Sequence, residues 1–112
     1  MSTISSTISY DHGVSTKKLI GETIGNFFDR TVAAHRDREA LVVRHQSIRW
    51  TWGELGRRVD ELAAGLLSLG LERGDRIGIW SPNRYEWTLT QFATAKAGLV
   101  LVNVNPAYRR AE

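Results

Sequence analysis

The sequence contains no cysteine, which excludes disulfide bonds, thiolate catalysis and cysteine metal sites. It also lacks any apolar run near the roughly 18 residues that a membrane-spanning helix needs. The first residues show neither the basic start and apolar stretch of a secretory signal nor the arginines of a transit peptide. We therefore expect a protein with no transmembrane segment that is located in the cytoplasm.

Nucleic-acid binding is not expected either, because no basic stripe with interleaved aromatic residues is present. The formal charge of +3 comes from 15 basic and 12 acidic residues spread along the chain. Hydrophobic residues make up 42% and charged residues 24%, which is typical of a globular protein. The 112 residues suit one small domain or a piece of a larger one.

The sequence also lacks the usual marks of a catalytic centre. His12, His35 and His45 have no partners at metal-ligand spacing, so we expect no metal site. No serine lies in a nucleophile-elbow pattern, and no glycine-rich loop precedes a helix in the way that phosphate binding requires. We therefore predict no catalytic residue within this chain.

Local patterns nevertheless indicate an ordered chain after its first residues. Residues 1–18 are rich in serine and threonine, and we expect them to form a flexible leader before a domain that spans residues 19–112. A first amphipathic helix is predicted over residues 24–35, with Thr23 as its N-cap. Two short strands, over residues 40–44 and 48–50, should pair as a hairpin through a Gln46-Ser47 turn.

The second amphipathic helix carries the strongest local signals. Thr51 and Glu54 have the spacing of a capping box, and Gly70 stands where a left-handed residue ends a helix. The apolar seam of this helix recurs in steps of four and three and comprises Leu55, Val59, Leu62, Leu66 and Leu69.

A βαβ unit is predicted next. Residues 77–80 read as a strand, Asn83 as the N-cap of a helix that Gly98 ends, and residues 99–104 as a second strand. Because one helix joins them, the two strands should be parallel, and we expect the second to be buried on both faces. Asn105-Pro106 then predicts the start of a further helix.

Three phrases of the sequence resemble the N-terminal region of the adenylate-forming acyl-CoA synthetases, the AMP-binding ligase family. They are REALVVRHQSIRWTWGEL, LAAGLLSLGLERGDRIGIWSPNRYEW and TQFATAKAGLVLVNVNPAYR. The resemblance runs from about Thr23 to the last residue, and NVNPAYR is most similar to the branch that acts on medium- and long-chain fatty acids. It implies an α/β fold that is the N-terminal portion of the large adenylate-forming domain, with an incomplete sheet.

The resemblance also implies a reaction. Members of the family activate a carboxylic acid, here a fatty acid, with ATP and Mg²⁺ to give an acyl-adenylate, which the thiol of coenzyme A converts to acyl-CoA. The family's phosphate loop, adenine and ribose contacts, hinge and catalytic lysine lie downstream of the matched positions, so we expect the isolated chain to be inactive. Asn105, Tyr108 and Arg109 follow the last strand and are the candidates for a contact near the coenzyme A path.

Two alternatives remain open from the sequence. The chain can be a complete, small, non-catalytic α/β module that binds a partner or a nucleotide. It can also come from a ligase of the same family that acts on an aryl or another carboxylic acid, because the residues that select the acid lie downstream.

Overall fold

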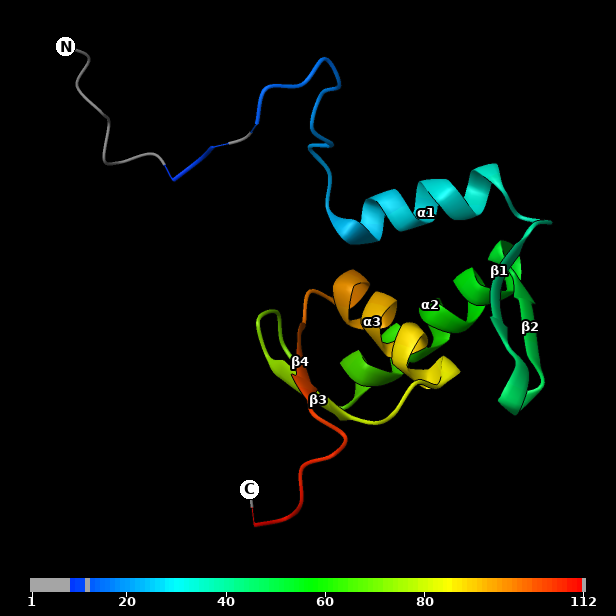
Figure 1. The fold of residues 1–112 in the computed structure, drawn as a ribbon, viewed down its shortest axis with the longest axis vertical. Coiled ribbons are helices and arrows are strands. Elements are labelled where there is room, and N and C mark those ends of the chain that lie inside the picture. The colour runs from blue at the N-terminus through cyan, green and yellow to red at the C-terminus, as the bar shows by residue number, and fades with distance from the viewer. Residues whose placement is uncertain (1–8, 12, 112) are drawn as a thin grey trace.

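The computed structural model describes residues 9–11 and 13–111, which form an α/β fold with two small sheets. The predicted leader lies partly outside the described residues, and its described part, residues 9–11 and 13–18, is exposed and contains no helix or strand. The elements are, in order, α1 (Ile24–Ala34), β1 (Glu39–Val43), the 3-10 helix η1 (Arg44–Gln46), β2 (Ile48–Thr51), α2 (Trp52–Ser68), β3 (Arg76–Trp80), α3 (Tyr85–Ala97) and β4 (Val100–Val104). Figure 1 shows the β1–β2 hairpin and the β3–β4 pair on opposite sides of α2 and α3.

The hairpin forms as predicted, but its turn is longer than the predicted two residues. Strands β1 and β2 pair antiparallel, with Val43 opposite Ile48. Between them the chain makes one 3-10 turn, and Ser47 then adopts a left-handed conformation (φ 57°) with its N–H bonded to the carbonyl of Arg44 at 3.1 Å. The tight Gln46-Ser47 turn is therefore wrong, which agrees with its lack of the Asn-Gly or Asp-Gly pair that two-residue turns favour.

Helices α1 and α2 begin at the predicted caps. The hydroxyl of Thr23 accepts a hydrogen bond from the N–H of Asn26, and that of Thr51 accepts one from the N–H of Glu54. The Glu54 carboxylate bonds Arg57 and Arg58 on its own helix rather than the N–H of Thr51, so only the threonine half of the predicted capping box forms. These two hydroxyls satisfy backbone N–H groups that have no partner within their helices.

The apolar seam of α2 is most deeply buried in its first half. Leu55 and Val59 are fully buried, Leu62 and Leu66 are half-buried, and Leu69 is 75% exposed at the helix end. Gly70 follows with φ +87°, the left-handed conformation predicted for it.

The core lies where the three helices meet. The ring of Phe28 on α1 stacks on that of Phe92 on α3, with centroids 4.5 Å apart. Helix α1 approaches α2 so closely that a Cβ on Gly56 would lie 2.9 Å from a methyl group of Val32. On the hairpin side, the rings of Trp50 and Tyr85 on α3 pack in a T-shaped arrangement, with their centroids 5.0 Å apart. The hairpin and the βαβ unit therefore share one helical core.

Strands β3 and β4 are parallel, as predicted, with Ile79 beside Asn103. One face of the pair packs on α3 and buries Ile79, whereas Trp80 is 57% exposed and Val100 and Val102 are more than two-fifths exposed. The expectation that β4 is buried on both faces is therefore wrong for the described residues. Within residues 13–111, the helices cover this pair of strands on one side only.

The predicted N-cap of α3 also differs from the structure. The capping position is Arg84 rather than Asn83, and its side chain makes no capping hydrogen bond. Instead, the side chain of Gln46, from the hairpin turn, accepts a hydrogen bond of 2.7 Å from the N–H of Tyr85. Gln46, 39 positions earlier in the chain, thus caps the N-terminus of α3 in place of the predicted local residue.

Lys96 on α3 ties the three helices together. Its ammonium group donates a 2.7 Å hydrogen bond to Asp29 on α1 and a second hydrogen bond to Asp60 on α2, and its side chain is only 18% exposed. Partial burial lowers the pKa of Lys96, but the hydrogen bonds to the two carboxylates outweigh it and hold the pKa above the ordinary value of 10.5. The folded state therefore binds this proton more tightly than the unfolded chain.

Replacing this lysine should remove a pH-dependent part of the stability. Because the pKa is raised on folding, the stabilisation is fully present below pH 10.5 and is lost as the pH rises through the pKa of folded Lys96. We expect Lys96→Met to lower the free energy of unfolding by about 1 kcal/mol at neutral pH, measured by urea denaturation followed by circular dichroism. The deficit should shrink above pH 10.5.

The matched control is Lys17→Met, which removes the same charge from an exposed position before α1. It should leave the unfolding free energy unchanged at both pH values. A Lys96→Met deficit that stays constant as the pH rises would contradict the proposed charge interaction and indicate a packing effect instead.

Candidate functional site

The carboxyl ends of β3 and β4 lie side by side, because the two strands are parallel and Trp80 pairs with Val104. The segments that leave the sheet at this edge begin at Ser81 and Asn105. Ligands of open α/β sheets bind beyond the carboxyl ends of the strands. This edge is therefore the place where the fold itself favours a site, and it is where the predicted candidates Asn105, Tyr108 and Arg109 follow β4.

These three candidates lie together on one exposed turn. The side-chain oxygen of Asn105 accepts a hydrogen bond from the N–H of Ala107 at 2.9 Å, and its carbonyl accepts one from the N–H of Tyr108 at 3.0 Å. Tyr108 is 52% exposed, and Asn105 and Arg109 are exposed as well. The turn carries a phenol and a guanidinium group, both of which can donate hydrogen bonds to a ligand.

The prediction of a helix that starts at Asn105-Pro106 is wrong for the described residues. The capping hydrogen bond of Asn105 forms, but the chain makes only isolated turns from Pro106 to Ala111. An N-cap residue favours the first turn of a helix, but the following turns are stable only when they pack against other elements.

The start of α3 is fixed to the hairpin by a contact that sequence reasoning missed. The side-chain oxygen of Gln46 accepts from the N–H of Tyr85, and its amide nitrogen donates a 2.9 Å hydrogen bond to the carboxylate of Glu86. The pKa of Glu86 is lowered from its ordinary value, chiefly by this hydrogen bond and in smaller part by Arg84. No local motif announces this contact, because its partners are brought together only by the packing of the hairpin on α3.

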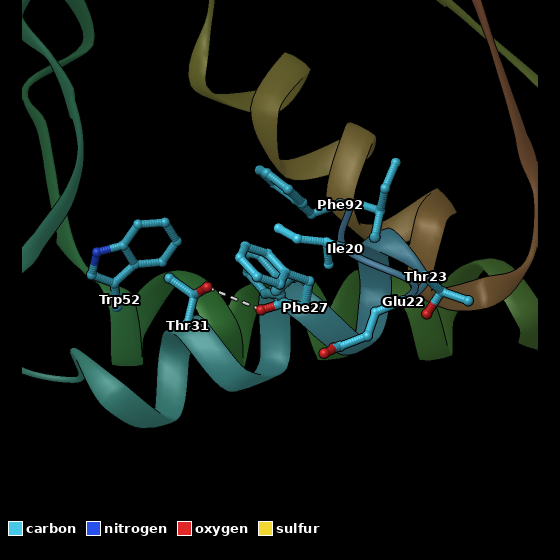
Figure 2. A pocket seen from close by; sticks show the side chains of 9 residues that line it. Ile20, Glu22, Thr23, Phe27, Thr31, Trp52 and Phe92 are labelled. Atoms are coloured by element: carbon cyan, nitrogen blue, oxygen red, sulfur yellow. Dashed lines mark hydrogen bonds between the residues drawn. The ribbon is translucent and has the colours of Figure 1, made fainter. Parts of the chain in front are cut away.

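An apolar groove of about 390 Å³ opens between the start of α1 and α3. Figure 2 shows Phe27, Trp52 and Phe92 around it, with Ile20 from the preceding segment. Its polar side chains are used locally. Thr23 caps α1, Thr31 donates to the carbonyl of Phe27, and Glu22 pairs with Arg30 at 2.7 Å. The groove therefore offers apolar surface but no catalytic group.

The described residues contain neither a glycine-rich phosphate loop nor a cluster of metal-ligating side chains. Gly70 ends a helix, Gly74 lies in a turn and Gly78 lies within β3, so none of them forms a phosphate-binding loop before a helix. No cluster of three or more metal-ligating side chains occurs in residues 9–11 and 13–111.

The described part of the chain contains no helix that is both long and apolar enough to cross a membrane. The longest helix, α2, has 17 residues and carries charged side chains on its exposed face.

Sequence comparison relates the chain to acyl-CoA ligases. A medium-chain acyl-CoA ligase named as mitochondrial is 52% identical in Danio rerio over 106 residues, and its human counterpart is 49% identical over 105 residues. A putative acyl-CoA synthetase of Bacillus subtilis is 41% identical over 95 residues. These alignments include 85–95% of this chain but only 17–18% of the relatives, so the chain spans less than a fifth of their length.

Solved structures lead to the same group of proteins. A fatty acyl-CoA synthetase of Mycobacterium tuberculosis superposes with a TM-score of 0.73 at 26% identity, over 77% of this chain and 17% of the other. The N-terminal subdomain of NpsA from Klebsiella oxytoca, bound to anthranilyl-AMSN, superposes with a TM-score of 0.74 at 28% identity, over 80% of this chain and 23% of the other. The fold is thus that of the N-terminal part of an adenylate-forming domain.

The model of one family, the AMP-binding enzymes, matches residues 28–112. The match takes in both sheets and helices α2 and α3, together with most of α1. The chain therefore belongs to the AMP-binding enzyme family.

Proposed function

We propose that this chain is the N-terminal part of an ATP-dependent fatty-acid–CoA ligase. The observation that carries the proposal is the family match over residues 28–112, together with relatives named as acyl-CoA ligases that are several times longer. The parent enzyme joins a carboxylic acid to coenzyme A through an acyl-adenylate and releases AMP and pyrophosphate. Its co-substrates are ATP and coenzyme A, and Mg²⁺ is its cofactor.

Within this reaction the chain has a supporting role. Its helical core positions the carboxyl edge of β3 and β4, and the adenylation machinery is supplied by residues outside this chain. The isolated chain is therefore inactive as a ligase. We also propose that the domain begins near residue 19, because α1 begins at Ile24 and the family match begins four residues later.

A medium- or long-chain fatty acid is the preferred acid. The relatives that are 49–52% identical are named medium-chain acyl-CoA ligases. The aryl alternative has one observation in its favour, the anthranilyl-AMSN bound to NpsA, but the identity to that protein is only 28%. Sequence similarity therefore favours the aliphatic acid. The third alternative, a complete non-catalytic module, is disfavoured because the relatives of similar sequence are named as ligases.

The cytoplasmic location inferred from the sequence is weakened by the names of the vertebrate relatives, which are mitochondrial. We propose the cytoplasm and the mitochondrion as the two alternative locations. Imaging of the parent protein with a C-terminal fluorescent tag distinguishes them, since co-localisation with a mitochondrial marker would reject the cytoplasmic proposal.

The direct test is an assay of AMP release by the parent protein that carries this chain at its N-terminus. We expect AMP release that depends on ATP, coenzyme A and octanoate or palmitate, and none from the 112-residue chain alone. Benzoate in place of the fatty acid tests the aryl alternative. A higher kcat/KM for benzoate than for the fatty acids would favour the aryl alternative. An absence of AMP release with every acid would overturn the ligase proposal.

Arg109 is the proposed contact for coenzyme A that is simplest to test. A guanidinium group that bonds a phosphate of coenzyme A contributes more than a neutral hydrogen bond, so Arg109→Gln in the parent should raise the KM for coenzyme A about tenfold. The first half-reaction, measured by ATP–pyrophosphate exchange, should be unchanged. Arg38→Gln is the charge-matched control, and an equal KM for coenzyme A in both variants would remove Arg109 from the site.

A further inference from the structure

A second cavity opens between the hairpin turn and the first turns of α3. Its volume is about 390 Å³, which lies within the range of small-molecule sites. Arg44 and His45 of η1 line one wall, and Arg84 and Trp87 line the other. Neither the predicted coenzyme A contacts nor the family match gives this cavity a role.

The two walls are held together by one side chain. Gln46 follows His45 directly, and its amide group bonds both Tyr85 and Glu86 at 2.7 and 2.9 Å. These two bonds fix the hairpin turn against the start of α3. The segment that carries Arg44 and His45 is therefore fixed beside the start of α3, where Arg84 lines the same cavity.

The charge of this cavity is of one sign. Its lining includes two guanidinium groups and an imidazole but no carboxylate. By contrast, the cavity beside Lys96 is lined by Asp29 and Asp60 as well as by basic residues, and both carboxylates pair with Lys96. Among the described residues, Arg44 and His45 form no ion pair.

Arg84 is only loosely engaged. Its Nε lies 3.5 Å from the carboxylate of Glu86, and both side chains are 45% exposed. An exposed ion pair of this length contributes little. The carboxylate of Glu86 is also held by Gln46. The guanidinium group of Arg84 can therefore turn to an incoming anion at small cost.

This arrangement suits a phosphate better than a carboxylate. Each guanidinium group presents a planar fork of N–H donors that bonds two oxygens at once, so two forks and a ring N–H need an anion with at least three acceptor oxygens. The N-terminus of α3 is not the source of the affinity, because the first N–H of the helix, that of Tyr85, is already bonded to Gln46.

We propose that the cavity between the hairpin turn and the start of α3 binds a phosphate-bearing anion through Arg44, His45 and Arg84. The proposal is independent of the ligase activity, because it rests only on the geometry and charge of the described residues. The phosphate can belong to a nucleotide or be inorganic. The indole of Trp87 lines the same cavity, so its NMR signal can report the binding of either a nucleotide or inorganic phosphate.

The test is a titration of the 112-residue chain with inorganic phosphate, followed by the NMR signal of the Trp87 indole N–H at constant ionic strength. We expect a saturable shift, and an affinity that falls about tenfold in Arg44→Gln and in Arg84→Gln, because each removes a charge-assisted pair of hydrogen bonds. Arg38→Gln lowers the net charge equally at an exposed position outside the cavity and should bind as tightly as the unchanged chain.

Further titrations identify the source of the phosphate and the limits of the proposal. Tighter binding of AMP than of inorganic phosphate supports a nucleotide, and equal binding supports free phosphate. Acetate should bind at least tenfold more weakly than phosphate. The proposal is overturned by a shift that does not saturate, by equal losses in Arg38→Gln and Arg44→Gln, or by adenosine that binds as well as AMP.

Discussion

The close approach of α1 to α2 is the constraint on which the rest of the structure depends. Gly56 lets the two helices meet at Val32, because a side chain at that position would collide with the valine. This contact brings Phe28 onto Phe92 of α3, which in turn carries β3 and β4 on its other side. If α1 and α2 were farther apart, the aromatic stack and the Lys96 contacts with both helices would be lost together.

The elements that the sequence predicted well are those specified by neighbouring residues. Thr23 and Thr51 cap their helices, and Gly70 and Gly98 end theirs with positive φ, because caps and left-handed glycines act over one helical turn. The errors have a common cause. Gln46 replaced Asn83 as the cap of α3, and the face of β4 that carries Val102 stayed exposed, because both outcomes depend on segments remote in sequence.

The sequence predicted where the candidate site lies but not which ligand it binds. The parallel strands placed Asn105, Tyr108 and Arg109 at the carboxyl edge, yet nothing in their spacing indicates what they bind, and the turn that holds them differs from the predicted helix. The cavity between the hairpin turn and the start of α3 was not predicted from the sequence. Arg44 and Arg84 are 40 residues apart in the sequence, and they line one cavity only because the hairpin turn packs against the start of α3.

The most direct test of the helix contact is the free energy of unfolding of Gly56→Ala compared with Gly65→Ala, measured by urea denaturation of the 112-residue chain. Val32 is packed and β-branched, so it cannot readily move aside, and Gly56→Ala should lower the stability by about 1–3 kcal/mol. Gly65 lies on the same helix with open space around it, so its replacement by alanine should raise the stability by up to about 1 kcal/mol. Equal or higher stability of Gly56→Ala would contradict the close helix contact as the basis of this fold.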